Sequence, residues 1–516
     1  MSSQVEDAAE LPPPYSEYPT ELPTHFPIAS FKPAPLVSVT ELQAHLRLLG
    51  AFHKLKQDVQ SQAEGIATTN KELGWVVFVN RAVYRFFEWT AATWNKSSPA
   101  LGEMYIPPLD VIMVWHTYLL NPRAFFEDAR RMSTTYCTNL IAIEDMPLTL
   151  ISSLIDPQTL DPLPPSEKRQ LFFEQVSQMS YHMPLATDYS DVLTLNCPFC
   201  AHPNPSVRWV ADGKSGFAQT KFSHTCEQCG ESFNKSNIGV RRFCEEVTRR
   251  RTGERVFISE TLLHYLTGTR SEDQSVEIMT KIFKWMDAAF QVNQPIPPES
   301  NVEAEITTLA TALRYDYLEL SDALHRAVRP FEAPDRTRQT PRIQRISVAY
   351  SHAGLASLDL VGAVLRQGAF IEKMVELGWT QPGRFDLVSE SAPLVRSIAR
   401  YHAFLDLMAT APTSFFVPTL DIVSMIVSIQ DQFSFLLNAS TFLMSRTWRG
   451  IPTSSNRIII EMTLFNISAD FQTTTIVLRR LCSLRDTISL PKHGSPASGF
   501  PIASVVASPI QIQNPV

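Results

Sequence analysis

The chain has 516 residues and a net charge of −7 at neutral pH, and 44% of its residues are apolar. This composition predicts a globular protein with sizeable cores, and the negative charge excludes a general attraction to nucleic acid or anionic membranes. Acidic residues Glu6, Asp7 and Glu10 stand where a signal peptide would be basic and then apolar, and no uninterrupted apolar run is long enough to span a membrane. We therefore expect a cytoplasmic or nuclear protein that does not bind membranes.

Residues 1–36 are rich in proline, which predicts an extended, disordered leader that stays outside the core. Within it, Pro12, Pro13 and Tyr15 fit the P-P-x-Y pattern that the aromatic grooves of WW domains bind. A WW-domain protein is therefore one expected partner. The alternative is a leader without a partner, because so short a pattern often arises by chance.

Helical periodicity begins after the leader. Apolar residues from Leu42 to Leu55 recur at steps of three and four positions, which predicts a helix that begins near Glu41. The stretch from Trp75 to Trp89 carries apolar residues on one side and predicts a second core helix.

Residues 107–122 read PPLDVIMVWHTYLLNP and predict a short third helix. Asp110 has the residue type and position of its N-cap, Asn121 stands at its end, and Pro122 starts the next helix. Trp115 contributes to the single buried side that we expect of this helix.

His116 is the main candidate outside the cysteines for a catalytic or metal-binding residue. Asp110 and His116 lie about 120° apart around a helix, which argues against a shared iron site. We interpret His116 as a core histidine that is hydrogen-bonded to a neighbouring loop.

Four of the seven cysteines form two C-x-x-C pairs. The pairs are Cys197 with Cys200 and Cys226 with Cys229. Two such pairs complete a tetrahedron of thiolates with no open position, which is typical of structural zinc, whereas reduced core thiols or a disulfide rarely show this spacing. Glycines and aromatic residues between the pairs predict a zinc ribbon of short strands. His202 and His224 lie close by, but with four thiolates present we place them outside the ligand set.

The region after the cysteines predicts further helices and contains the densest basic run of the chain. Arg249–Arg251 and Arg255 are interleaved with Glu245, Glu246 and Glu254. This alternation indicates a solvated helix face rather than a nucleic-acid contact.

The motif at residues 107–122, with Phe125–Asp128 after it, resembles the signature of the glycine-rich domain-containing protein-like family in its fungal branch. Fungal members place two C-x-x-C pairs after this motif, with a segment between them that Gly216 and Phe217 match. The role of the motif residues in the family is unknown. They are Asp110, Trp115, His116, Asn121 and Pro122. Further segments that follow the fungal pattern are residues 357–361, 366–370, 400–404 and 417–422, so the resemblance spans about residues 35–422.

The chain departs from the family pattern after Asp421. The family usually continues with a W-H-x-H segment, whereas this chain continues with Ile422 to Ile426 and then with serine- and threonine-rich sequence. Our hypothesis is that residues 423–516 form an aberrant tail, for which a retained intron followed by a frameshift is one explanation.

Three segments of the chain recur in the same order and at nearly constant spacing, which predicts two copies of one helical unit. The pairs are 50–52 with 368–370, 84–87 with 401–404, and 107–110 with 418–421. We therefore expect a mainly α fold of two related helical units with an inserted four-cysteine zinc ribbon, a small β element, and disordered termini. The expected divisions are a leader (1–36), helical unit 1 (37–185), the zinc ribbon (186–240), a helical linker region (241–340), a truncated helical unit 2 (341–422) and a divergent tail (423–516).

Three classes of function follow from these features. The sequence favours a non-enzymatic zinc-binding interaction or regulatory protein, with structural zinc as its cofactor. The resemblance implies a second class, because fungal relatives are often labelled 2-oxoglutarate-dependent dioxygenases, but the H-x-D motif of such enzymes is missing. The third class, RNA or DNA binding, is suggested by plant relatives whose RNA-binding segments this chain lacks. Neither a catalytic residue nor a small-molecule substrate can be assigned.

Overall fold

The computed structural model describes residues 21–92, 101–264, 270–290, 302–328, 336–387, 390–411, 419 and 421–422. All of these belong to one unit of the chain, Met1–Ala469. The expected WW ligand, Pro12, Pro13 and Tyr15, lies outside the described residues, as does the tail at 423–516. None of the described helices combines the length and the apolar character that crossing a membrane requires.

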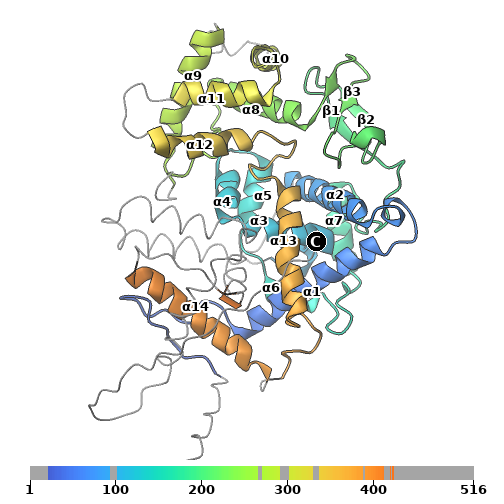
Figure 1. The fold of residues 1–516 in the computed structure, drawn as a ribbon, viewed down its shortest axis with the longest axis vertical. Coiled ribbons are helices and arrows are strands. Elements are labelled where there is room, and N and C mark those ends of the chain that lie inside the picture. The colour runs from blue at the N-terminus through green and yellow to red at the C-terminus, as the bar shows by residue number, and fades with distance from the viewer. Residues whose placement is uncertain are drawn as a thin grey trace, which may run out of the picture. The chain divides into compact units, whose positions relative to one another are not determined.

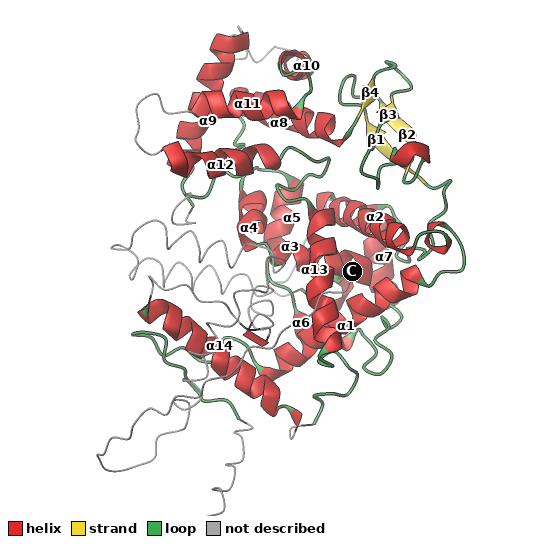
Figure 2. Ribbon diagram, viewed as in Figure 1, coloured by secondary structure: helices red, strands yellow, loops and turns green. Residues whose placement is uncertain are grey.

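Helices dominate the described structure, which confirms the mainly α prediction (Figure 1). The α-helices are α1 (Val39–Gln60), α2 (Lys71–Ala91), α3 (Leu109–Leu119), α4 (Pro122–Arg130), α5 (Thr135–Ala142), α6 (Leu148–Ser153), α7 (Glu167–Ser177), α8 (Lys235–Arg251), α9 (Glu272–Phe290), α10 (Val302–Ala312), α11 (Tyr317–Val328), α12 (Arg336–Val348), α13 (Leu360–Glu376) and α14 (Ala392–Thr410). The strands are β1 (Val192–Asn196), β2 (Pro203–Arg208), β3 (His224–Thr225) and β4 (Ser232–Phe233), and Figure 2 shows them gathered beside one another. Short 3₁₀ turns are η1 (Ile66–Thr68), η2 (Glu103–Tyr105) and η3 (Asp212–Lys214).

The start of α1 shows how local sequence sets a helix boundary. Ser38 is the N-cap, and its hydroxyl accepts a hydrogen bond from the N–H of Glu41 at 3.1 Å. The Glu41 carboxylate accepts the Ser38 N–H in return at 2.8 Å, which completes a capping box. The leucines at positions 42, 46 and 49 are buried on one side of the helix, as the periodicity predicts.

Helix α3 lies at the centre of the first hydrophobic core, and every residue in it is buried. The sequence predicted only one buried side. The difference arises because α2, α4 and α13 all contact α3, so that no face remains for solvent. A short helix that is apolar on all sides is stable only in such a position.

Asp110 is not the N-cap that the sequence predicted, because Pro108 holds that position. Asp110 lies in the first turn of α3, where its carboxylate forms a buried ion pair of 2.7 Å with Arg85 of α2. Burial raises the pKa of Asp110, and the guanidinium of Arg85 opposes that rise. Pro122 is the first residue of α4, as predicted, and Asn121, which was expected only at the end of the preceding helix, is the N-cap of α4.

The C-terminal helices α13 and α14 share the first core with α1–α7. The sequence predicted a separate unit at 341–422, whereas α13 packs directly on α1, α2 and α3 (Figure 1). Arg400 of α14 pairs with Asp421 at 2.8 Å. In the proposed repeat Arg85 corresponds to His402 and not to Arg400, so this ion pair is not the counterpart of the pair between Arg85 and Asp110. The two related helical units stay a prediction.

The later part of the proline-rich leader does not stay outside the core. Phe26 is 7% exposed and Ile28 is 3% exposed. Both lie in a short hairpin in which the N–H of Ile28 and the carbonyl of Phe31 form a hydrogen bond. The leader was expected to remain extended because of its proline content. Burial of the apolar side chains between the prolines stabilises the folded hairpin instead.

A second hydrophobic core is formed by α8–α12. The basic run lies at the end of α8, where acidic side chains from neighbouring segments neutralise much of it. Arg249 pairs with Glu254, Arg251 with Asp287, and Arg255 with Glu272. The run is therefore paired within the protein, and it is not the fully solvated face that the sequence predicted, because the Arg251 side chain is 5% exposed.

Arg131, directly after α4, lies between the two cores and is fully buried. Its guanidinium pairs with the carboxylates of Asp128 at 2.9 Å and of Glu246 at 2.8 Å. Burial alone would lower the pKa of Arg131, but the two carboxylates raise it well above its ordinary value. The side chain is therefore charged in the interior and depends on both partners.

Hydroxyl groups complete this buried network. Tyr118 of α3 and Ser357 donate hydrogen bonds to Asp128 at 2.5 and 2.8 Å. Tyr350 donates to Glu246 at 2.5 Å. The network thus ties α3 and α4 to α8 and to the segment that leads into α13.

We predict that Arg131→Met lowers the free energy of unfolding by about 3–5 kcal/mol, because Asp128 and Glu246 would be left as buried carboxylates without a cation. The measurement is urea unfolding followed by circular dichroism. The control is Arg249→Met, which removes an exposed ion pair with Glu254 and should cost less than about 1 kcal/mol. Equal effects of the two replacements would contradict a structural role for the buried network.

Candidate metal centre

Each C-x-x-C pair lies at the turn of a hairpin. Strands β1 and β2 are antiparallel and enclose the first pair, and β3 and β4 are antiparallel and enclose the second. The sequence predicted short strands in the interval between the pairs, and only β2 and β3 lie there. Strands β1 and β4 flank the pairs on the outer side, so the ribbon consists of two separate hairpins.

The two cysteine turns have the same backbone geometry. The N–H of Cys197 donates to the carbonyl of His202, and the N–H of Ala201 donates to the carbonyl of Cys197, both at 2.9 Å. The second turn repeats these bonds with Cys226, Glu231 and Gly230. Ala201 and Gly230 both have positive φ, which closes the chain around the thiols.

The four sulfur atoms come together as the spacing predicted, with all distances among them within 4.8 Å. The Sγ atoms of Cys197 and Cys229 lie 3.7 Å apart, as do the Sγ atoms of Cys200 and Cys226. A disulfide would require about 2.05 Å, whereas a tetrahedron with zinc–sulfur bonds of about 2.3 Å has edges of about 3.8 Å. The arrangement therefore fits a single four-coordinate metal ion.

The thiols of the cluster differ in acidity. Burial raises the pKa of Cys197 to about 12. Burial acts in the same direction on Cys226, but backbone N–H groups of Cys229 and Gln228 and neighbouring thiols donate to its sulfur and lower its pKa to about 6. Cys200 and Cys229 are exposed, so an ion can enter from solvent.

His202 and His224 lie outside the cluster of candidate ligands, which consists of the four cysteines. His202 contributes its backbone carbonyl to the first cysteine turn. The ring of His224 packs edge-on against Phe233 with 5.6 Å between ring centroids. Both histidines therefore contact parts of the hairpins.

The ribbon is joined to both helical cores. Ile66 of η1 and Val77 of α2 belong to the same apolar cluster as Val207 and Phe222 of the ribbon. On the other side, Arg241 of α8 donates to the carbonyl of Pro198 in the first cysteine turn at 3.0 Å. Phe199 of that turn packs edge-on against Tyr315 with 4.5 Å between centroids. The ribbon is therefore not an independent finger.

We predict one metal ion per chain, with loss of at least most of it on Cys200→Ser, because three thiolates leave the tetrahedron incomplete. Elemental analysis of the purified, tag-free protein measures the stoichiometry. Cys137→Ser is the control, since Cys137 is a buried thiol of α5 outside the cluster. Full metal content in the Cys200 variant, or none in the natural chain, would contradict the assignment.

The family motif on α3 forms packing contacts rather than a second ligand cluster. His116 is fully buried, as expected of a core histidine, and its Nε2 lies 3.1 Å from Nε2 of His45 on α1. Trp115 donates from its indole N–H to the carbonyl of Ile143 at 2.8 Å. Sequence analysis missed His45 because its pairing with His116 depends on how α1 packs on α3.

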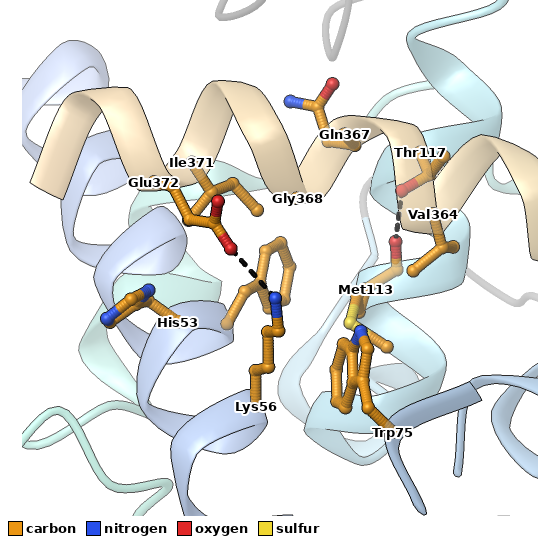
Figure 3. A pocket seen from close by; sticks show the side chains of 11 residues that line it. His53, Lys56, Trp75, Met113, Thr117, Val364, Gln367, Gly368, Ile371 and Glu372 are labelled. Carbon is orange, nitrogen blue, oxygen red and sulfur yellow. Dashed lines mark hydrogen bonds and ion pairs between the residues drawn. The ribbon is translucent and has the colours of Figure 1, made fainter. Parts of the chain in front are cut away.

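A small pocket lies between α1, α2, α3 and α13 (Figure 3). Trp75 and Met113 form part of an apolar wall, and the ion pair of Lys56 with Glu372, 2.8 Å long, crosses it on one side. The space holds about one or two water molecules. Its lining residues are Phe52, His53, Lys56, Trp75, Met113, Thr117, Val364, Gln367, Gly368, Ile371 and Glu372.

We predict that Gly368→Ala raises the free energy of unfolding by about 0.5–1 kcal/mol, because alanine has the higher helix propensity. Gly368 lies within α13, and a Cβ added there meets no other atom within 4 Å. Thermal and urea unfolding measure the change. The contrasting variant is Gly239→Ala in α8, whose Cβ would lie 2.0 Å from the carbonyl oxygen of Tyr350 and should destabilise. Destabilisation by both replacements would contradict the open space beside Gly368, because it would show that a Cβ at this position meets other atoms.

A model of a protein family matches part of the chain, whereas no curated protein and no solved structure matches it. The matching family model covers residues 317–434, which include α11 to α14, whereas the motif at 107–122 and the four cysteines lie outside it. The match continues past Asp421 to residue 434, although the sequence was expected to depart from the family pattern directly after Asp421. Residues 317–434 are thus identified as sequence of the family described as glycine-rich domain-containing protein-like, which confirms the resemblance over that segment.

Proposed function

We propose that the chain is a non-enzymatic zinc-binding interaction or regulatory protein. The observation that carries this proposal is the closed cluster of four cysteines, whose sulfur atoms lie within 4.8 Å of one another. Four thiolates fill every position of a tetrahedral zinc ion, so the ion has no site for a substrate or a reactive water. The ligands would be Cys197, Cys200, Cys226 and Cys229, and zinc bound there would stabilise the fold.

The contacts of the ribbon indicate what zinc would stabilise. Its apolar cluster includes Val77 of α2, and Arg241 of α8 bonds to its first cysteine turn. Free energy gained on metal binding is folding free energy for the segment that supplies the ligands. Zinc would therefore brace the surfaces that the helices present to a partner. Four reduced thiols suit a cytosolic or nuclear compartment.

The dioxygenase alternative is weakened by the partners of its candidate residues. A facial triad requires two histidines and a carboxylate on one ion. Asp110 is paired with Arg85, and His116 lies against His45. Turnover of 2-oxoglutarate with added iron, lost on replacement of His116, would favour that alternative.

The nucleic-acid alternative would require exposed basic and aromatic side chains around the cysteine turns. Arg208, Lys214 and Lys221 are exposed there, but the denser run at the end of α8 is paired with carboxylates. Retention on RNA or DNA that weakens steeply with salt would favour this alternative.

The partner that we propose is a WW-domain protein, bound through Pro12, Pro13 and Tyr15. We predict that Tyr15→Ala weakens binding of the zinc-loaded full chain to a purified WW domain at least tenfold, because the tyrosine fills the groove that reads this pattern. Fluorescence anisotropy with a labelled WW domain measures the affinity. Tyr18→Ala is the matched control, since it removes a nearby tyrosine outside the pattern. Equal affinities of the natural chain and the Tyr15 variant would exclude the motif as a WW ligand.

A further inference from the structure

Residues 21–37, which we call the N-terminal strap, are attached to α14. The strap folds back on itself, with hydrogen bonds between Ile28 and Phe31 and from the N–H of Phe26 to the carbonyl of Pro33, all at 2.9 Å. Ala29 at its tip has a φ of 50°. The N–H of Ala29 donates to the Asp406 carboxylate of α14 at 2.7 Å.

His402 of α14 forms the other part of the attachment. The ring of Phe26 stacks on the imidazole with 3.9 Å between centroids and 17° between planes. The backbone N–H of Leu36 donates a hydrogen bond to Nε2 of the same imidazole, with 3.1 Å between the two nitrogen atoms. His402 itself is fully buried.

The partners of His402 fix its protonation state. Nδ1 lies 2.7 Å from the carbonyl oxygen of Ile398, and because a carbonyl only accepts, Nδ1 must carry the proton. A backbone N–H only donates, so Nε2 must be bare to accept the bond from Leu36. The contact therefore requires neutral imidazole. A second proton on Nε2 would place two donors against each other at a buried position.

We propose that His402 makes the strap a pH-sensitive attachment, closed when the imidazole is neutral and released from α14 when Nε2 is protonated. Release would expose Phe26 and Ile28, which are buried in the closed form.

Two observations bear on the pH at which release occurs. Burial lowers the pKa of His402 below its ordinary value of 6.5, and the hydrogen bond to Ile398 opposes that shift. Because the pKa in the closed form is lowered, the attachment is strongest above pH 6.5 and weakens as the pH falls below it. Stacking of Phe26 on a charged imidazole would offset part of this effect.

Other charged and titratable groups lie near the contact between the strap and α14. Asp406 holds the N–H of Ala29, and Glu41 at the start of α1 holds the N–H of Ser38. His25 and Lys32 of the strap are exposed, so solvent screens them. Arg400 and Tyr401 flank His402 on α14, where Arg400 is paired with Asp421. His25 is the single histidine of the strap itself, and it provides a control.

The test is hydrogen exchange of the full chain at pH 7.5 and pH 5.5, with rates corrected for intrinsic exchange. We expect peptides that contain the amides of Ala29 and Leu36 to lose up to about tenfold in protection at pH 5.5, as follows from a pKa of 6.5 in the released form. Peptides from residues 76–86 of α2 should keep their protection. An unchanged strap, or an equal loss in α2, would overturn the proposal.

Two variants separate His402 from other effects of acid. In His402→Gln the amide oxygen replaces Nε2 as an acceptor that does not titrate, so protection of the strap should no longer depend on pH. In His25→Gln the dependence should remain as in the natural chain. Loss of the dependence in the His25 variant, or its persistence in the His402 variant, would contradict the assignment to His402.

Discussion

The buried charge of Arg131 is the constraint on which the arrangement of the two helical cores depends. Apolar contacts are non-directional and tolerate several packings, whereas a guanidinium without water requires its acceptors at fixed places. Those acceptors come from Asp128 of α4 and from Glu246 of α8. Tyr350 and Ser357 add bonds from the segment before α13. The observed arrangement brings all of these groups to the same guanidinium and its carboxylates.

Sequence reasoning succeeded where the determinants lie close together along the chain. The four cysteines could be assigned to one cluster because each C-x-x-C turn places two sulfur atoms by itself, and the structure brings all four within 4.8 Å. Pro122 starts α4 because its fixed φ and missing N–H suit that position. The helical periodicity around Leu46 likewise predicted the buried side of α1.

Sequence reasoning failed where a residue's environment is supplied by a distant segment. Asp110 has the character of an N-cap, but Arg85 of α2 determines its role. His116 lies against His45 of α1, and no pattern in the sequence around either residue predicts that pair. The burial of all sides of α3 depends on α13, whose contact with it could not be deduced from either helix alone. The strap is a similar case, since its prolines predicted exposure while Phe26 found a stacking partner on α14.

The position of the ribbon explains why a structural metal would matter beyond its own hairpins. In a zinc finger that folds alone, the free energy of metal binding stabilises only the finger. Here Val77 of α2 belongs to the apolar cluster of the ribbon, and Tyr315, in the second core, packs against Phe199 beside the first cysteine pair. Loss of order in the cysteine turns would therefore remove contacts from both cores. A metal at this place would link the two cores through the ribbon, as Arg131 links them through the buried network.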